Sequence, residues 1–378
     1  MMIPANKTAR LIFAGGGTGG HLYPAIAIAD RVSELLKDRM NVEIMFVGTT
    51  RGLEYRIRET LGYPLQIINV RGIVRSLDVR NLLVPFVLIG ALLKAHRLIS
   101  SFSPHVVVGT GGYVSWPILR VAASHKITTV LQEQNSFPGI TTRKLATRAN
   151  RIYLGFAKAS EYLHTDARII VTGNPVRRTI SDGDRAEALK AFNLDPRKKT
   201  ILVIGGSQGA RAVNNAVLKS LLAGSLPEGF QLLWQTGKRD YKEVITNAGE
   251  KVQGHALFPF ENRMALVYAV ADLAIARAGA ITLAELEACA VPSLLIPYPF
   301  AAGDHQRKNA EEVTRQDLAI TVDDRDLDQH DVLKDAVREL TNGHAEVMRG
   351  KLKSLRLNKK PAVDFIAEDI IELIQTAA

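Results

Sequence analysis

The stretch LIFAGGGTGGH, residues 11–21, joins an apolar run to a glycine-rich turn and the start of a helical pattern. A related stretch, ILVIGGSQGAR, occurs at residues 201–211. A buried strand, a tight glycine turn and a helix form the first unit of a doubly wound α/β fold. Glycine allows close approach, and the helix N-terminus favours an anion. The repeat predicts two α/β domains, each able to bind a phosphate-like group.

Short apolar, strand-like runs alternate with helical patterns through both halves of the chain. They occur at residues 42–47, 106–108, 128–131 and 169–171, and again at 231–234, 273–276 and 294–296. This alternation indicates parallel sheets covered by helices on both faces. Asn174-Pro175 favours a turn, so we place the domain boundary after residue 176. Pro361 precedes a last helical pattern at 362–376, which could pack on either domain.

The composition fits a soluble two-domain protein. The chain has 378 residues, of which 47% are hydrophobic and 23% charged. The only cysteine, Cys289, lies in an apolar stretch, which excludes an intrachain disulfide and favours a reducing compartment. The first ten residues lack the apolar segment of a signal peptide.

The net charge of +10 belongs to the first half. Residues 1–176 hold 21 Lys and Arg and 10 Asp and Glu residues, a balance of +11, and the rest balances to −1. A basic half can meet nucleic acid, anionic lipid or a phosphorylated substrate, or can serve solubility alone.

Residues 82–93, LLVPFVLIGALL, form an apolar run with Arg75 and Arg80 before it and Lys94 and Arg97 after it. A bilayer span needs about 20 apolar residues, so this run is too short to cross. It fits a buried core helix, or a helix on a membrane surface with basic flanks on anionic headgroups. The charge of this half favours the membrane.

Alternative nucleotide sites fit the glycine loops poorly. Gly15, Gly17 and Gly20 match G-x-G-x-x-G, but the second strand ends in Val-Gly-Thr-Thr without the acid that holds a dinucleotide ribose. No Gly-Lys-Ser/Thr follows, which excludes a Walker P-loop. Near residues 303–309 one His and one Asp are too few ligands for a metal, so we expect none.

Seven motifs occur in one order: GGGTGGH (15–21), GTGGYVS (109–115), EQN (133–135), GNPVR (173–177), GGSQGAR (205–211), RAGAITLAE (277–285) and DHQRKNA (304–310). Together they resemble the MurG family of glycosyltransferases of peptidoglycan synthesis. The resemblance implies the GT-B fold, an α/β architecture of two Rossmann-like doubly wound domains facing a cleft. Residues 1–176 with 361–378 would form the acceptor and membrane domain, and 177–360 the UDP-GlcNAc domain.

The resemblance also implies an activity. Members transfer GlcNAc from UDP-GlcNAc to the 4-hydroxyl of MurNAc in undecaprenyl-pyrophosphoryl-MurNAc-pentapeptide (lipid I), with inversion to a β-1,4 link. We therefore expect UDP-GlcNAc, lipid I and anionic lipid as partners, no nucleic acid and no cofactor. The expected location is peripheral, on the cytoplasmic face of the cell membrane.

Family roles transfer to matching positions. Arg177 and Ser207 would meet the donor diphosphate, and Glu285 the ribose. Glu261 stands where the family usually has an apolar residue that meets uracil through its backbone. The full donor set is Thr18, Gly19, Gly20, Asn135, Arg177, Ser207, Glu261, Ala280, Ile281, Thr282, Leu283, Ala284, Glu285, Gln306 and Asn309. Gln306 and Asn309 would read sugar hydroxyls. The acceptor side would contain Gly111, Gly112, Tyr113 and Ser115.

An inverting transfer needs a base for the acceptor hydroxyl and stabilisation of the charge that builds on UDP. His21 is the first candidate base, because an imidazole can accept a proton near neutral pH; it could instead stabilise its loop or bind phosphate. Glu133 is the second candidate, and it could instead orient its neighbours. Glu285 could also cap its own helix.

Two other functions remain open from the sequence. One is a different lipid-directed glycosyltransferase, for example one acting on diacylglycerol; the GGYVS and EQN stretches disfavour it. The other is a non-catalytic sensor of nucleotide sugars or lipid headgroups, which His21, Arg177 and Glu285 disfavour.

Overall fold

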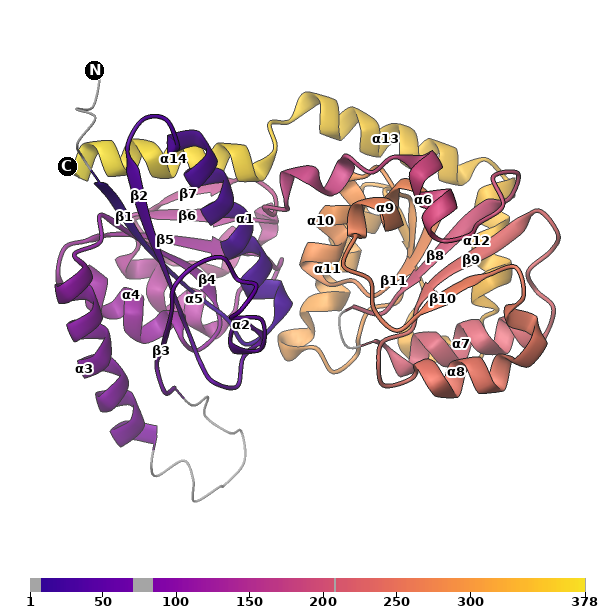
Figure 1. The fold of residues 1–378 in the computed structure, drawn as a ribbon, viewed down its shortest axis with the longest axis horizontal. Coiled ribbons are helices and arrows are strands. Elements are labelled where there is room, and N and C mark those ends of the chain that lie inside the picture. The colour runs from indigo at the N-terminus through magenta and orange to yellow at the C-terminus, as the bar shows by residue number, and fades with distance from the viewer. Residues whose placement is uncertain (1–7, 71–83, 207–208, 378) are drawn as a thin grey trace. The chain divides into compact units, whose positions relative to one another are not determined.

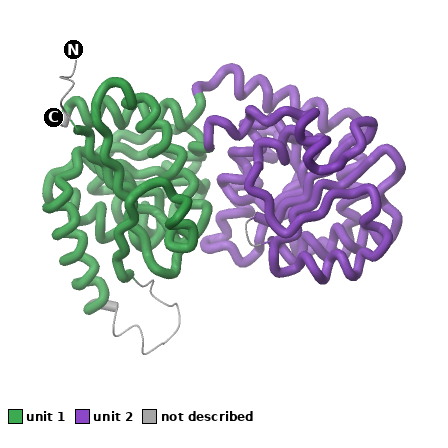
Figure 2. The backbone as a smooth tube through the Cα atoms, viewed as in Figure 1, with its two compact units in different colours: residues 1–176, 361–378 green, residues 177–360 purple. Residues whose placement is uncertain are grey.

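A computed structural model describes residues 8–70, 84–206 and 209–377. The chain divides into two compact units, Met1–Val176 with Pro361–Ala378 (unit 1) and Arg177–Lys360 (unit 2), coloured separately in Figure 2. Each unit is built around one parallel sheet.

Within the described residues, unit 1 has a seven-stranded sheet in the order β3-β2-β1-β4-β5-β6-β7, and the recorded pairings are parallel. Its strands are β1 (Thr8–Gly15), β2 (Asn41–Gly48), β3 (Leu65–Ile67), β4 (Val106–Gly111), β5 (Thr128–Glu133), β6 (Arg151–Leu154) and β7 (Arg168–Val171). Its helices are α1 (Gly19–Leu36), α2 (Leu53–Arg56), α3 (Val84–Phe102), α4 (Ser115–Ser124), α5 (Ile140–Leu145) and α14 (Ala362–Ala377), with short η2 (Ala146–Arg148) and η3 (Ala157–Tyr162). The order reverses between β1 and β4, where this kind of fold binds ligands.

Helices cover both faces of the unit 1 sheet. One core joins β1, α1 and α14, and a second contains buried residues of α3 and α4. The last helix, α14, lies beside α1 (Figure 1) and buries Ile366, Ile370 and Ile374 there. An ion pair of 2.6 Å between Arg31 and Asp364 joins the two helices.

Unit 2 repeats the plan with a six-stranded parallel sheet, β10-β9-β8-β11-β12-β13, in the described part of the chain. Its strands are β8 (Lys199–Ile204), β9 (Phe230–Gln235), β10 (Ala256–Phe258), β11 (Leu273–Ala276), β12 (Ser293–Leu295) and β13 (Ala319–Thr321). Its helices are α6 (Arg185–Ala191), α7 (Arg211–Leu222), α8 (Tyr241–Ala248), α9 (Met264–Ala269), α10 (Ala280–Ala288), α11 (His305–Thr314), α12 (Val332–Thr341) and α13 (His344–Asn358). Short turns η4 (Arg178–Ser181), η5 (Gly249–Val252), η6 (Ala302–Asp304) and η7 (Asp324–Asp326) complete it.

The central strands explain why the sequence forms these sheets. β4 and β11 are buried along their whole length, and β8 along all but its first residue, as parallel strands covered on both faces require. The predicted fold class, two Rossmann-like doubly wound units, is confirmed.

The apolar run at residues 82–93 has a mixed environment where it is described, because residues 82 and 83 lie outside the described residues. Ala91 and Ala95 of α3 are buried in the second core of unit 1. Phe86, Ile89 and Leu93 are 74%, 56% and 58% exposed. The helix is therefore a core element on one face and an apolar surface on the other. Among the described residues no helix is long and apolar enough to cross a membrane.

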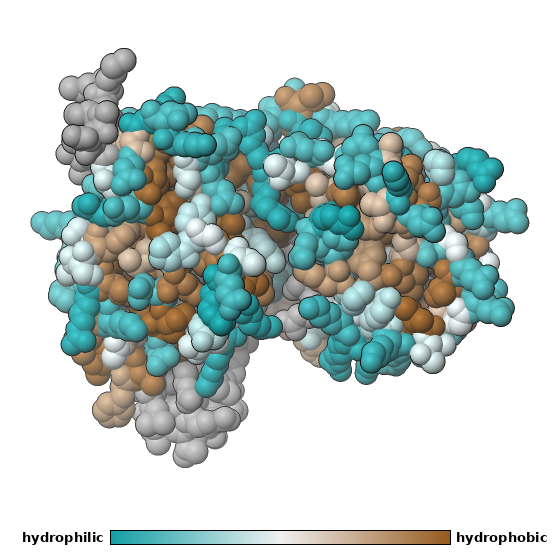
Figure 3. Space-filling view, viewed as in Figure 1, coloured by the Kyte–Doolittle hydropathy of each residue, from teal (hydrophilic) through white to brown (hydrophobic). Residues whose placement is uncertain are grey.

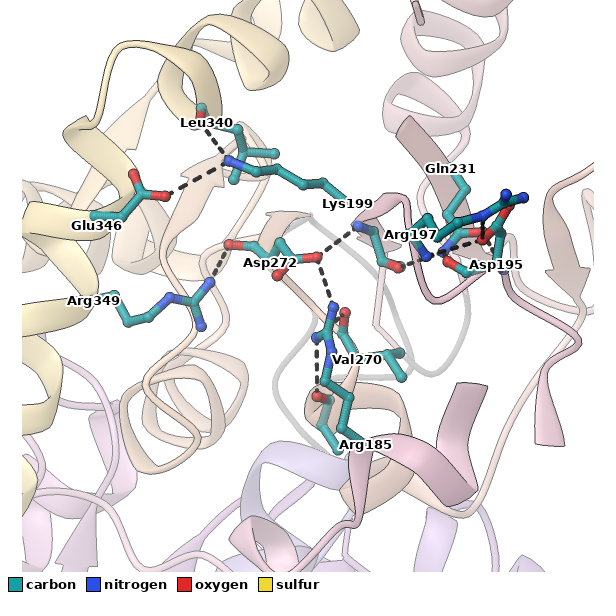
Figure 4. A network of polar contacts seen from close by, with 12 residues as sticks. Arg185, Asp195, Arg197, Lys199, Gln231, Val270, Asp272, Leu340, Glu346 and Arg349 are labelled. Atoms are coloured by element: carbon teal, nitrogen blue, oxygen red, sulfur yellow. Dashed lines mark hydrogen bonds and ion pairs between the residues drawn. The ribbon is translucent and has the colours of Figure 1, made fainter. Parts of the chain in front are cut away.

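At the amino ends of the unit 2 strands, polar side chains form a network of hydrogen bonds (Figure 4). Asp272 Oδ2 accepts from the backbone N–H of Thr200 at 2.7 Å and from Arg185 at 3.2 Å. The Arg349 guanidinium donates to the backbone carbonyl of Asp272 at 2.5 Å. The network joins α6, β8, β11 and α13.

Candidate active site

The first glycine loop connects β1 to α1 at the carboxyl edge of the unit 1 sheet. Thr18 precedes the helix in an extended conformation, and its carbonyl accepts from the N–H groups of His21 and Leu22 at 3.3 and 3.1 Å. Thr18 and Gly20 are exposed, and Gly19 is half-buried. The loop thus presents its backbone to solvent at a helix N-terminus, as an anion site requires.

A buried carboxylate that the sequence analysis missed holds this loop by hydrogen bonds to its backbone. Glu54 is 1% exposed and accepts from the backbone N–H groups of Gly17 and Thr49, both at 2.8 Å. A Cβ on Gly16, Gly48 or Gly52 would approach the Glu54 side chain within 2.6 Å, so a larger residue at any of the three would displace this carboxylate. The sequence spacing of these glycines gave no sign that they surround one carboxylate.

The second glycine loop packs directly on the first. The Thr110 hydroxyl donates to the His21 carbonyl at 2.8 Å. Gly111 lies against the His21 ring: a Cβ there would be 2.6 Å from Nδ1. Gly112 lies against the Gly16 carbonyl, at 2.7 Å from its own hypothetical Cβ. Both glycines have positive φ, of 107° and 81°, so larger residues would be strained as well as too large.

Ser115 and Tyr113 have opposite environments. Ser115 is fully buried, and its hydroxyl lies 2.5 Å from the Ala14 carbonyl and 2.7 Å from the Gly111 carbonyl. It joins the ends of β1 and β4. Tyr113 is 56% exposed and is available to a ligand.

The two candidate bases differ in their hydrogen bonding. His21 is half-buried, and its Nδ1 lies 3.0 Å from Gln134 Oε1. Glu133 is 3% exposed, and its carboxylate accepts from the N–H groups of Asn135 and Gly139, both at 3.1 Å. Its Oε1 also accepts from the Asn135 side-chain amide at 3.3 Å. This geometry suits Glu133 to holding the loop that carries Asn135.

In unit 2 the third glycine loop follows β8. Ser207 lies outside the described residues, so its predicted phosphate contact remains a prediction. Gly209 has a φ of 78°, and a Cβ there would be 2.4 Å from the Thr236 carbonyl. The same carbonyl accepts from the buried Asn214 amide at 2.8 Å, so the loop rests on a fixed support.

Glu285 lies on α10 at the carboxyl edge of β11. Its Oε2 accepts from the hydroxyl of the buried Tyr268 at 2.8 Å. Burial raises the pKa of the Glu285 carboxyl, while the Tyr268 hydrogen bond and the Arg177 charge act in the lowering direction. Burial and the same carboxylate raise the pKa of Tyr268, which keeps the phenol a donor. Sequence reasoning missed Tyr268, which thus occupies Oε2 of this carboxylate.

The rest of α10 shows which residues reach the surface. Ala280 and Leu283 are buried, whereas the remaining predicted donor contacts on this helix, Ile281, Thr282 and Ala284, are half-buried. The exposed Arg177 precedes η4, and its charge acts on both Glu285 and Tyr268.

The loop after β12 is held by hydrogen bonds from several sides. Arg277 is buried and donates to the carbonyls of Ile296 and Pro297 and to Asp324. Gln306 Oε1 accepts from the Tyr298 N–H at 3.0 Å. Asn309 is fully buried, with its amide 3.4 Å from the Ala278 carbonyl. The loop that was predicted to read the sugar is therefore tied to the loop before α10.

The backbone N–H of Glu261, which was expected to contact uracil, already has a hydrogen-bond partner within the protein. The Glu261 backbone N–H donates to Gln235 Oε1 at 3.0 Å. Its carboxylate accepts from the N–H groups of Asn262 and Arg263 and pairs with the Arg263 guanidinium at 2.8 Å. The Arg263 side chain is the largest cause that lowers the pKa of the Glu261 carboxyl. Base recognition through this N–H would require Gln235 to give up its hydrogen bond.

Within residues 8–70, 84–206 and 209–377, no three His, Cys, Asp or Glu side chains cluster in a way that would hold a metal ion.

Comparison with known proteins gives consistent family matches. The glycosyltransferase family 28 N-terminal domain matches residues 11–154, and the family 28 C-terminal domain matches residues 200–366. The UDP-N-acetylglucosamine--N-acetylmuramyl-(pentapeptide) pyrophosphoryl-undecaprenol N-acetylglucosamine transferase of Flavobacterium psychrophilum is 39% identical, over 97% of this chain and 98% of its own. The protein of the same name from Chlorobaculum parvum is 41% identical, over 90% and 95%.

Solved structures share the fold. MurG of Acinetobacter baumannii superposes with a TM-score of 0.72 at 24% identity, covering 97% of this chain and 99% of its own. A UDP-GlcNAc 2-epimerase of Neisseria meningitidis reaches 0.65 at 12% identity, covering 98% and 100%. The GT-B architecture therefore serves more than one chemistry, and the sequence relatives decide the family. Both family 28 domains and near-full-length relatives match, so this chain belongs to the MurG family of glycosyltransferases.

Proposed function

We propose that this protein transfers GlcNAc from UDP-GlcNAc to the 4-hydroxyl of MurNAc on undecaprenyl pyrophosphate, forming a β-1,4 link with inversion. The observation that carries this proposal is the identity of 39% over 97% of the chain to a transferase named for that reaction. The residues at the carboxyl edges of both sheets supply suitable chemistry.

Unit 2 is the proposed donor side. Glu285, held at Oε2 by Tyr268, offers Oε1 to the ribose hydroxyls. Arg177 supplies positive charge for the diphosphate, with Ser207 as a predicted partner. Gln306 is proposed to read sugar hydroxyls. Asn309 was expected to do the same, but it is fully buried, so we propose instead that it holds this loop in place.

Unit 1 is the proposed acceptor side. Gly111 and Gly112 shape the wall beside His21, and the exposed Tyr113 is a direct contact. Ser115 contributes by joining the two loops. From the family resemblance, Thr18, Gly19, Gly20 and Asn135 are proposed to contact the donor.

The proposed chemistry is a single displacement. His21 takes the proton of the acceptor hydroxyl as its oxygen attacks the anomeric carbon. The bond from that carbon to the UDP oxygen breaks on the opposite side, which inverts the configuration. The leaving diphosphate carries the electron pair, and the Arg177 charge stabilises it. Glu133 orients the Asn135 loop in this scheme.

We further propose that α3 binds the cytoplasmic surface of the cell membrane through anionic lipid. Phe86, Ile89 and Leu93 form an exposed apolar surface on this helix, and Lys94 and Arg97 follow it as exposed cations. Figure 3 shows apolar side chains gathered over this part of unit 1. An apolar surface bordered by cations is typical of interfacial helices.

The membrane proposal is tested with anionic vesicles. Replacing Phe86 and Leu93 together by Ser should weaken binding to phosphatidylglycerol vesicles at least tenfold, because each large side chain buried in lipid contributes roughly 1.5–3 kcal/mol. Leu357→Ser, at an 85% exposed position of unit 2, is the matched control and should bind like the wild type. Leu88 and Leu92 are half-buried and unsuitable, since Leu92 packs on the core. Unchanged binding of the double variant would refute the proposal.

The transfer itself is tested with radiolabelled UDP-GlcNAc and a lipid I analogue. We expect label in the lipid product together with an equal amount of free UDP. Label appearing only when diacylglycerol replaces the analogue would favour the other lipid-directed transferase. Binding of UDP-GlcNAc without product or UDP would favour a sensor.

A further inference from the structure

A buried group of side-chain amides lies behind His21. Gln132 and Gln134, at the end of β5 and just after it, are 1% and 2% exposed. Asn174 approaches them from the loop that follows β7. Buried amides must satisfy both their N–H and C=O groups, so their orientations are tightly constrained.

The orientation of the Gln134 amide follows from backbone carbonyls. Its Nε2 lies 2.8 Å from the Thr110 carbonyl and 3.1 Å from the Gln132 carbonyl. Carbonyl oxygens only accept hydrogen bonds, so the amide nitrogen must occupy this place. The Gln134 oxygen therefore faces His21.

A second set of contacts closes the group. Gln134 Nε2 also donates to Gln132 Oε1 at 2.5 Å, and Gln132 Nε2 donates to Asn174 Oδ1 at 3.1 Å. The Asn174 amide donates to the Gln134 carbonyl at 2.9 Å. Each of the three amides can therefore take only one of its two flip orientations if the hydrogen bonds of its neighbours are to form.

This arrangement determines which nitrogen of His21 carries the hydrogen. Gln134 Oε1 can only accept, so at 3.0 Å the His21 Nδ1 must donate. A neutral imidazole has one N–H, so its Nε2 carries the lone pair. No described residue donates to or accepts from that Nε2.

We propose that Gln134 is a positioning residue that holds His21 in the Nδ1–H form, with Nε2 as the proton acceptor. This inference rests on the proposed function of His21 as the base. In the step, the proton of the acceptor hydroxyl moves to Nε2, the hydroxyl oxygen bonds to the anomeric carbon, and the electron pair of the broken bond leaves on UDP. The resulting imidazolium still donates from Nδ1 to Gln134. An amide oxygen orients the ring without adding a negative charge beside it.

The tautomer can be measured directly. In protein labelled with ¹⁵N-histidine, the His21 signals are those missing from His21→Ala. Wild-type His21 should show a protonated Nδ1 and an unprotonated Nε2 in its neutral form. Gln134→Met should lose this preference, whereas Gln132→Met should keep it, because two backbone carbonyls still orient the Gln134 amide. An Nε2–H form in the wild type would overturn the inference, whatever the variants do.

Kinetics provide the second readout. Gln134→Met should lower kcat at least tenfold and leave KM for UDP-GlcNAc within about twofold, since a wrong tautomer removes the base without removing the donor site. Gln132→Met is the matched control for disturbing the buried group and should keep kcat within about threefold. Equal losses in both variants would overturn the positioning role. If Gln134→Met changes the tautomer but His21→Ala retains turnover, the orientation stands and the proposed base role falls.

Discussion

The two edges of the unit 2 sheet both carry an acidic side chain beside an arginine, but the two carboxylates have different environments. At the amino edge, Asp272 Oδ2 accepts from two donors of the chain itself, the Thr200 N–H and the Arg185 guanidinium (Figure 4). At the carboxyl edge, Glu285 receives Tyr268 on one oxygen, while burial raises its pKa. A carboxylate held by the chain's own backbone N–H and an arginine contributes to stability, whereas a buried carboxylate with a perturbed pKa is a functional-site signature.

Unit 1 shows the same contrast with two histidines. At the amino edge, His105 Nδ1 accepts from the Arg10 N–H at 3.0 Å, next to the start of β4. At the carboxyl edge, His21 Nδ1 hydrogen-bonds to Gln134, and Nε2 is the nitrogen that we propose as the proton acceptor. Polar residues of one type therefore have different roles according to the strand end they occupy.

The largest difference should be between two alanine variants, one at each histidine. His21→Ala should lower turnover on the order of 10²-fold or more, the usual range for loss of a general base. His105→Ala should leave turnover within about twofold, since it removes a contact remote from the chemistry. Steady-state assays with lipid I analogue measure both, and a His21→Ala enzyme with near-normal turnover would remove His21 as the base.

The next effect concerns donor affinity. Glu285→Ala should weaken UDP-GlcNAc binding about 30-fold, because hydrogen bonds to a charged group contribute roughly 2 kcal/mol. Asp272→Ala should bind the donor like the wild type. Isothermal titration calorimetry distinguishes them, and equal affinities for both variants would contradict the assignment of Glu285.

For folding stability, unlike donor affinity, Asp272→Ala should have a larger effect than Glu285→Ala. Asp272→Ala should lower the free energy of unfolding by about 1.5 kcal/mol, because the buried Thr200 N–H loses its partner. Glu285→Ala should lose less, because the unliganded fold no longer holds a carboxylate whose ionised form is disfavoured by burial. Urea denaturation of both variants checks this, and a greater loss for Glu285→Ala would reverse the interpretation.

The smallest effect is a pH dependence at the amino edge. Asp317, near the start of β13, and Glu339 hydrogen-bond to His344 and raise its pKa above 6.5. The stabilisation from this cluster should be complete below pH 6.5 and be lost as pH rises through the raised value. Thermal unfolding from pH 5.5 to 8.5 should show this slope, and His344→Gln should flatten it. An equal slope in the variant would show that other groups cause it.

Periodicity and glycine turns were enough to predict the fold class, because buried parallel strands read as continuous apolar runs. The site was less accessible to sequence reasoning. His21, Gln134 and Glu285 stood in visible motifs. The roles of Glu54, Tyr268 and Gln134, however, depend on contacts between segments distant in sequence. Ser115 belonged to a recognisable motif, yet only the structure shows that its hydroxyl hydrogen-bonds to two backbone carbonyls of the protein itself. Local pattern also left α3 undecided, because one face is core and the other is exposed.

Hydrogen–deuterium exchange with and without UDP-GlcNAc tests most directly whether the carboxyl edge of unit 2 binds the donor. We predict protection of residues 209–213, 277–286 and 298–309, with no change at residues 195–200, 270–273 and 317–319. Protection confined to the amino-edge segments, or absent from residues 277–286 at saturating donor, would contradict the assignment.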